Sequence, residues 1–114
     1  MIKMRKMTDK QLQKEFHLLN EQFFDDKLPW INVDFGGNLP GTDGHFDMTR
    51  NEIHLSPGLR NFPNLLLIVL LHEMAHANMA HRGYRGYPGD GGHGGLFQVE
   101  LDRLYKAGAY DNLL

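Results

Sequence analysis

The stretch Leu65–His76, LLLIVLLHEMAH, decides the fold of this chain. Its first seven residues are all apolar, and a helix with this composition would be buried nearly all round rather than along one stripe. Pro63 suits the first turn of such a helix, and Gly83 suits its end. The sequence therefore predicts a buried helix that begins near Pro63 and stops by Gly83.

The same stretch ends in an H-E-x-x-H motif formed by His72, Glu73 and His76. Residues four apart on a helix point to the same side, so both imidazoles can reach one ion. In this interpretation His72 and His76 are zinc ligands, and Glu73 is the general base that accepts a proton from water. A shuffled chain of this composition would hold roughly 0.02 such motifs, so chance is a poor explanation. A surface helix with two solvated histidines does not fit the apolar run before the motif.

A catalytic zinc site normally has three protein ligands, so the two histidines need a partner. His81 is the nearest in sequence, but nine steps of about 100° place it roughly 180° around the helix from His72. The elongated motif H-E-x-x-H-x-x-G-x-x-H is also excluded, because Met79 replaces its glycine and Arg82 replaces its last histidine. The third ligand must therefore come from outside this helix.

His93 is the predicted third ligand of a single catalytic Zn²⁺. It lies 17 residues after His76, in a glycine-rich loop (residues 83–95) that holds 7 of the 13 glycines. Glycine gives the backbone the freedom to return this side chain to the motif. Glu100 is the alternative ligand, and its more ordinary role is that of a carboxylate on the last helix.

Apolar periodicity predicts a helix before the motif, from Thr8 to about Asp26. Thr8 and Gln11 have the spacing of a capping box at its start. Leu28-Pro29 ends the segment, because proline disfavours a helical conformation at the preceding residue. The expected apolar stripe of this helix consists of Leu12, Phe16, Leu19 and Phe23.

Three short strands and a last helix complete the expected elements. The alternating apolar residues of the strands are Ile31, Val33 and Phe35, then Phe46 and Met48, then Ile53 and Leu55. The second and third strands are expected to form a hairpin around Thr49–Asn51. The last helix is expected to end near Gly108. Its residues at helical spacing are Leu96, Phe97, Leu101, Leu104 and Tyr105.

Size and composition indicate one domain over residues 1–114, with residues 1–7 as a flexible arm. The chain has no cysteine, so any metal must be held by His, Asp or Glu. With 12 basic and 14 acidic residues, it lacks the overall charge expected for a nucleic-acid-binding protein. We expect neither a signal peptide nor a membrane span, since the apolar run is far below about 18 residues. These features favour a cytoplasmic protein.

An ordered series of motifs runs through nearly the whole chain. Its members are Asn20 with Phe23-Phe24 and Leu28-Pro29, Gly44 ahead of Asn51–Pro57, Leu71–Ala77, and His93-Gly94 with Phe97. This series resembles the SprT-like zinc metallopeptidase domain, a family that includes the Spartan proteases. The last element is similar to the family's H-G-x-x-F signature. The histidine of that signature is the third zinc ligand, so the resemblance also indicates His93.

The resemblance implies a zincin-like α+β fold. Its expected parts are an N-terminal helix, a small three-stranded sheet, the buried H-E-x-x-H helix and a C-terminal helix, with an extended substrate along a sheet edge. Many bacterial members carry a C-terminal cysteine zinc ribbon, which this sequence cannot form. The DNA-binding extensions of Spartan-type members are not expected here either.

The predicted function is zinc-dependent hydrolysis of peptide bonds in a protein or peptide substrate. Nucleic acid is a further partner that the family resemblance allows, with little support from these residues. One alternative is a non-catalytic, zinc-stabilised protein-binding module, against which Glu73 argues because a structural site needs no base. Another is a zinc hydrolase of a non-peptide substrate. Tyr84, Arg85, Tyr87 and His54 are candidates for a second oxyanion donor, and the sequence selects none of them.

Overall fold

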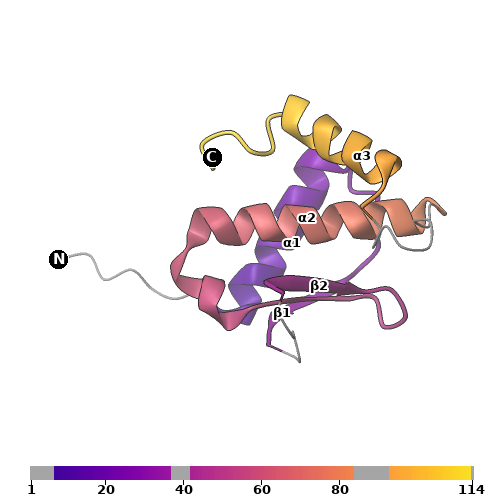
Figure 1. Ribbon diagram of the computed structural model, residues 1–114. Helices are drawn as coiled ribbons and strands as arrows, with labels where there is room; N and C mark the ends of the chain where they lie inside the picture. Colours follow the sequence, from indigo (N-terminus) through magenta and orange to yellow (C-terminus); the bar gives the residue numbers. More distant parts are fainter. Residues whose placement is uncertain (1–6, 37–41, 84–92, 114) are drawn as a thin grey trace.

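The computed structural model describes residues 7–36, 42–83 and 93–113. In this part of the chain, three α-helices and a three-stranded sheet form an α+β fold (Figure 1). The elements are α1 (Asp9–Phe23), β1 (Asn32–Phe35), β2 (Gly44–Asp47), β3 (Glu52–Leu55), the 3₁₀ helix η1 (Pro57–Asn61), α2 (Pro63–His81) and α3 (Gly95–Lys106). The predicted α+β class is confirmed, and η1 is an element that the sequence patterns did not predict.

Helix α2 carries the H-E-x-x-H motif and runs between α3 and the sheet (Figure 1). Consecutive residues around Met74 are buried, which is the burial on all sides that its composition predicts. The prediction is wrong for the first turns, where Leu65 is 45% exposed and Ile68 is half-buried. The burial follows the contacts of α3, which packs on the second half of α2 through Phe97 and Glu100.

The sheet has the strand order β1-β3-β2. Strand β1 pairs with β3 in parallel, and β2 pairs with β3 antiparallel, with Phe46 opposite Ile53. The expected hairpin around Thr49–Asn51 is therefore present. Alternation along the strands turns Ile53 and Leu55 into the core and leaves His54 on the other face.

Side chains of α1 hold the outer edge of β1. The predicted capping box is present at the start of α1, where Thr8 and Gln11 exchange hydrogen bonds. From the same helix, Gln13 accepts a hydrogen bond from the backbone N–H of Val33 at 2.8 Å and donates one to the carbonyl of Ile31 at 2.9 Å. Asp9 accepts one from the N–H of Phe35 at 3.0 Å. These bonds satisfy backbone groups of β1 that would otherwise be open to another strand.

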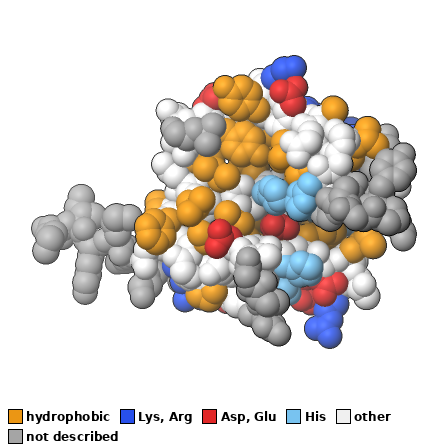
Figure 2. Space-filling model, viewed as in Figure 1, with side chains coloured by type: hydrophobic (Ala, Val, Ile, Leu, Met, Phe, Trp, Pro, Cys, Tyr) orange, Lys and Arg blue, Asp and Glu red, His pale blue; other side chains and the backbone are white. Residues whose placement is uncertain are grey.

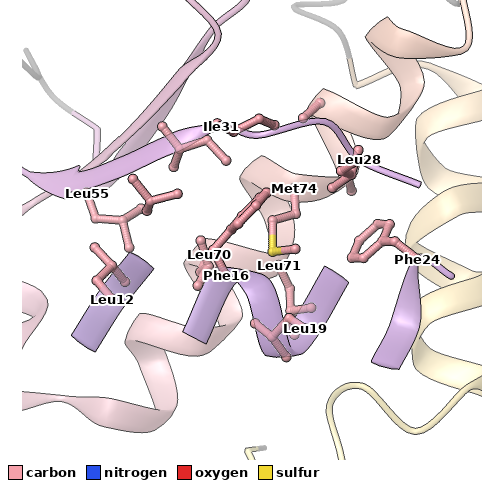
Figure 3. Close-up of a cluster of buried hydrophobic side chains, with 14 of the residues drawn as sticks. Leu12, Phe16, Leu19, Phe24, Leu28, Ile31, Leu55, Leu70, Leu71 and Met74 are labelled. Carbon is pink, nitrogen blue, oxygen red and sulfur yellow. The ribbon is translucent and has the colours of Figure 1, made fainter. Parts of the chain in front are cut away.

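The core lies where α1, α2 and the inner face of the sheet meet. Its side chains point toward one another across these three layers (Figure 3). Members that are fully buried include Leu12, Phe16, Ile31, Ile53, Leu55, Leu66, Leu70, Leu71, Met74 and Leu104.

Six predicted apolar positions lie outside the buried core, and two of them, Phe46 and Leu101, are partly buried against it. Phe23 is only partly buried, because α1 ends there and the chain turns Phe24 inward instead. Met48 follows the end of β2 and is 51% exposed, which places it outside the strand pattern. On α3, Leu96 and Tyr105 are 56% and 62% exposed, since the buried face of that helix runs through other residues: Phe97, Glu100 and Leu104.

Helix α3 ends at the glycine that the sequence indicated. Gly108 has a φ of +89°, and its N–H bonds to the carbonyl of Tyr105, while the N–H of Ala109 bonds to that of Leu104. This pair of bonds is a Schellman motif, in which glycine adopts the left-handed conformation at little steric cost. Most of the predicted arm (1–7) and of the glycine-rich loop (83–95) lies outside the described residues. In the described ranges, no helix combines the length and apolar character needed to cross a membrane.

Candidate metal centre

Three histidine side chains converge where the second half of α2 meets the start of α3. His72 and His76 come from α2, and His93 stands two residues before α3. The Nε2 atom of His93 lies 3.3 Å from Nε2 of His72 and 3.1 Å from Nε2 of His76. Histidine side chains reach the surface near the middle of the face shown in Figure 2. His93 is exposed, whereas His72 and His76 are half-buried, so the cluster is open to solvent on one side.

These separations fit one zinc ion. Zinc–nitrogen bonds of about 2.0–2.1 Å at tetrahedral angles place two ligand nitrogens about 3.3 Å apart. Hydrogen bonding does not explain the arrangement equally well, because one ring nitrogen offers either one proton or one lone pair. His93 Nε2 therefore cannot bond well to both neighbours at once. A single ion satisfies all three nitrogens, and these three side chains form a group that could hold a metal ion.

The surroundings favour neutral imidazoles, the form that binds metals. Burial lowers the pKa of His76 to about 4, with further contributions from the neighbouring charges of His72, His93 and His45. Burial and the charge of His93 also lower the pKa of His72. At neutral pH each α2 imidazole is therefore uncharged and has one ring nitrogen with a free lone pair for a metal.

Phe97 packs against all three imidazoles. Its ring stacks on His76 with a centroid distance of 4.1 Å and an interplanar angle of 15°. Its centroid lies 5.1 Å from that of His72 and 5.2 Å from that of His93. With 3% of its surface exposed, Phe97 closes the inner side of the cluster and restricts how the rings can turn.

Glu73, which follows His72 in the motif, is buried, with 7% of its surface exposed. Burial raises the pKa of Glu73 to about 7, although a backbone hydrogen bond from Phe46 acts in the opposite direction. Strand β2 comes very close on this side. A Cβ atom on Gly44 would lie 2.8 Å from Val69 Cγ1 and 3.3 Å from Glu73 Cγ. The absence of a side chain at Gly44 lets β2 approach the helix beside the carboxylate.

The sequence was compared with models of known protein families. The model of the SprT-like family matches residues 12–112, a range that includes the three histidines and Glu73. The chain belongs to the SprT-like family. No curated protein and no solved structure matches the chain. The SprT-like match covers every described helix except the first turn of α1.

In this SprT-like chain, the other candidate ligands lie apart from the cluster. His81 is near the turn between β2 and β3, where its Nε2 lies 3.1 Å from Asn51 Oδ1. Glu100 is turned to a different part of α2, where it accepts a hydrogen bond from Asn78 and pairs with Arg103 of its own helix. The structure brings His93, rather than either of these residues, to the α2 histidines.

Among the candidates for a second oxyanion donor, His54 is engaged on the far face of the sheet. Its Nδ1 lies 2.6 Å from Asp34 and its Nε2 lies 2.9 Å from Glu52. Burial alone would lower the pKa of His54, but the hydrogen bonds and charges of these two carboxylates raise it. The other three candidates, Tyr84, Arg85 and Tyr87, lie outside the described residues.

Sequence reasoning missed four features of this SprT-like site. It gave Gly44 no role beyond the family series, and it assigned no role to His45 or Asn78. It placed Phe97 in the apolar stripe of its helix and in the H-G-x-x-F signature, but it did not predict the contact of this ring with the imidazoles. The alternation of side chains along a strand could have placed Gly44 on the same inner face of its strand as Phe46. The other contacts depend on how α3 and β2 pack on α2, which no local pattern encodes.

Proposed function

We propose that this chain is a zinc-dependent peptidase with a zincin-like arrangement, which hydrolyses peptide bonds in protein or peptide substrates. The observation that carries the proposal is the place of Glu73. This buried carboxyl lies on the helix that supplies two of three converging imidazoles, beside an edge strand of the sheet. Membership of the SprT-like family supports the same function.

Each side chain of the site has a separate role in the proposed reaction. His72, His76 and His93 would hold zinc through their Nε2 atoms. Bound zinc supplies Lewis acidity, which makes water a better nucleophile at neutral pH and polarises a carbonyl group. Glu73 accepts the proton of the attacking water at its carboxylate and returns it to the leaving nitrogen.

The two edges of the sheet differ in how they can receive an extended peptide. Side chains of α1 already occupy backbone groups on the outer edge of β1. On the other side, the N–H of Ser56 bonds to the carbonyl of Asp43 just before β2. The antiparallel ladder alternates from this pair, so the backbone groups of Gly44 and Phe46 face away from β3, where the backbone of Phe46 already makes a hydrogen bond with Glu73. This edge lies beside Glu73, which supports β2 as the edge strand along which an extended substrate binds.

The test is to compare the wild type with Glu73→Gln, using zinc content and cleavage of an unfolded protein such as casein. The variant keeps the size of the side chain and all three imidazoles but removes the base. We expect it to retain zinc and to lose about 100-fold or more of the cleavage rate. Glu21→Gln, on the exposed side of α1, is the matched control and should cleave like the wild type. Unchanged cleavage by Glu73→Gln would refute the proposed mechanism.

A further inference from the structure

Glu100 is a buried carboxylate that the proposed hydrolysis does not use. Only 4% of its surface is exposed. A buried charge is costly unless it is paired and hydrogen-bonded, so its partners define its role. One oxygen accepts a hydrogen bond from the side-chain amide of Asn78 on α2, and the other lies 2.5 Å from Nε of Arg103. Glu100 therefore joins α3 to the helix that carries the motif.

Arg103 extends this connection to α1. Nη1 of Arg103 donates a hydrogen bond of 2.8 Å to the carbonyl of Phe23, the last residue of α1. The guanidinium of Arg103 also lies 5.3 Å from the ring centre of Phe24. The last carbonyls of a helix lack partners within the helix and interact favourably with a positive charge. The three helices are thus linked through one buried carboxylate and one arginine.

Helix α3 and the two residues before it carry His93 and Phe97 of the histidine site. Phe97, which stacks on His76, stands one turn before Glu100. The carbonyl of His93 accepts a hydrogen bond from Gln98 Nε2 at 3.3 Å. On the facing helix, Asn78 stands two residues after His76. The position of α3 along α2 therefore sets the distance between His93 and the other two histidines.

We propose that Glu100 is a positioning residue for the metal site, which anchors α3 on Asn78 and thereby holds His93 and Phe97 against the imidazoles of α2. The proposal rests on the proposed function in so far as the three histidines bind zinc. It assigns Glu100 a role in retaining the metal, without contact with zinc or substrate. Its consequence is that breaking the contact with Asn78 accelerates zinc release, although every ligand is still present.

The experiment measures the rate of zinc release to a chromogenic chelator. Asn78→Asp places two carboxylates face to face in a buried site, and Asn78→Ala removes the amide while substituting the best helix former. Loss of a group that orients metal ligands typically costs about 10- to 100-fold in affinity, and we expect both variants to release zinc faster by an amount in this range. The double variant Asn78→Asp with Glu100→Gln reverses the direction of the hydrogen bond, since the new amide can donate to the new carboxylate and still accept from Arg103. It should recover most of the loss.

The matched control is Asp102→Asn, which breaks the exposed ion pair of 2.8 Å with Lys106 on the same helix without touching α2. It should release zinc at the wild-type rate. Wild-type release by both Asn78 variants, or failure of the double variant to slow release, would overturn the role of Glu100. If Asn78→Asp does not fold, Asn78→Ala decides.

Zinc release and peptide cleavage are separate readouts. Faster release in the Asn78 variants of a protein that cleaves nothing would support the role of Glu100 and refute the proposed function. If the wild type cleaves casein but the Asn78 variants release zinc at the wild-type rate, the proposed function is supported and the role of Glu100 is refuted. A wild type that binds no zinc would refute both.

Discussion

Gly44→Ala tests the close approach of β2 to the motif helix. The added methyl group would lie 2.8 Å from Val69 Cγ1 and 3.0 Å from Leu55 Cδ2, and the first distance is shorter than real contacts allow. Val69 cannot yield easily, because a β-branched side chain in a helix has one strongly preferred rotamer. The strand must therefore move away from α2, and with it from Glu73.

Both stability and cleavage should respond. Overpacking of this kind costs about 1–3 kcal/mol. For 114 residues the entropy of unfolding is about 240 cal/mol/K, so each kcal/mol lowers the melting temperature by about 4 °C. We expect a loss of about 4–12 °C by calorimetry. A displacement of about 1 Å at a catalytic group can cost about 100-fold, so kcat/KM should fall far more than zinc affinity.

Gly58→Ala is the matched control, because its added methyl group would meet nothing closer than Ser56 Oγ at 3.6 Å. This variant should melt and cleave like the wild type. If Gly44→Ala also had the wild-type melting temperature and kcat/KM, the tight contact between β2 and α2 would be refuted. The argument that this edge of the sheet presents substrate to Glu73 would then lose its support.

Three further predictions concern contacts away from the cluster. Thr8→Ala removes the side-chain cap of α1 and should lower the free energy of unfolding in urea by about 1 kcal/mol; no change would mean that the cap contributes nothing. The side chain of Asn20 bonds to the buried N–H and C=O of Leu28 at 3.1 Å each, so Asn20→Ala leaves both groups without their partner. We expect this variant to lose about 2–4 kcal/mol of its free energy of unfolding, and a loss below about 1 kcal/mol would contradict this assignment. Burial lowers the pKa of His54, but Asp34 and Glu52 together raise it more. These ion pairs therefore stabilise the fold below the unfolded pKa and lose this effect as the pH rises through the folded pKa. The urea stability lost in Asp34→Asn should therefore be larger at about pH 5.5 than at about pH 9, and equal losses would contradict the ion pair.

Much of the fold could be predicted because its signals are local. The capping box of α1 needs only the spacing of Thr8 and Gln11, and the end of α3 needs only the tolerance of Gly108 for positive φ. The exclusion of His81 needs only the pitch of a helix. Each of these features is fixed by residues within a few turns of one another, so a single sequence suffices.

The parts that escaped prediction depend on contacts between distant elements. The pattern on α3 offered Leu96 and Tyr105 as core residues, but the helix buries Glu100 instead, because Asn78 and Arg103 satisfy its charge. A buried carboxylate of this kind looks like a surface residue in sequence. Likewise, nothing near Gly44 reveals that α2 passes at contact distance. Packing between elements, and not the elements themselves, sets these details of the site.

The central claim is that α2 and the segment before α3 form one metal site from three histidines. The most direct measurement is a zinc titration of the wild type, His93→Ala and His81→Ala by competition with a chelator. We predict one tightly bound zinc per chain, a large loss of affinity in His93→Ala, and wild-type affinity in His81→Ala, whose imidazole lies outside the cluster. Wild-type affinity in His93→Ala, or an equal loss in both variants, would contradict the claim.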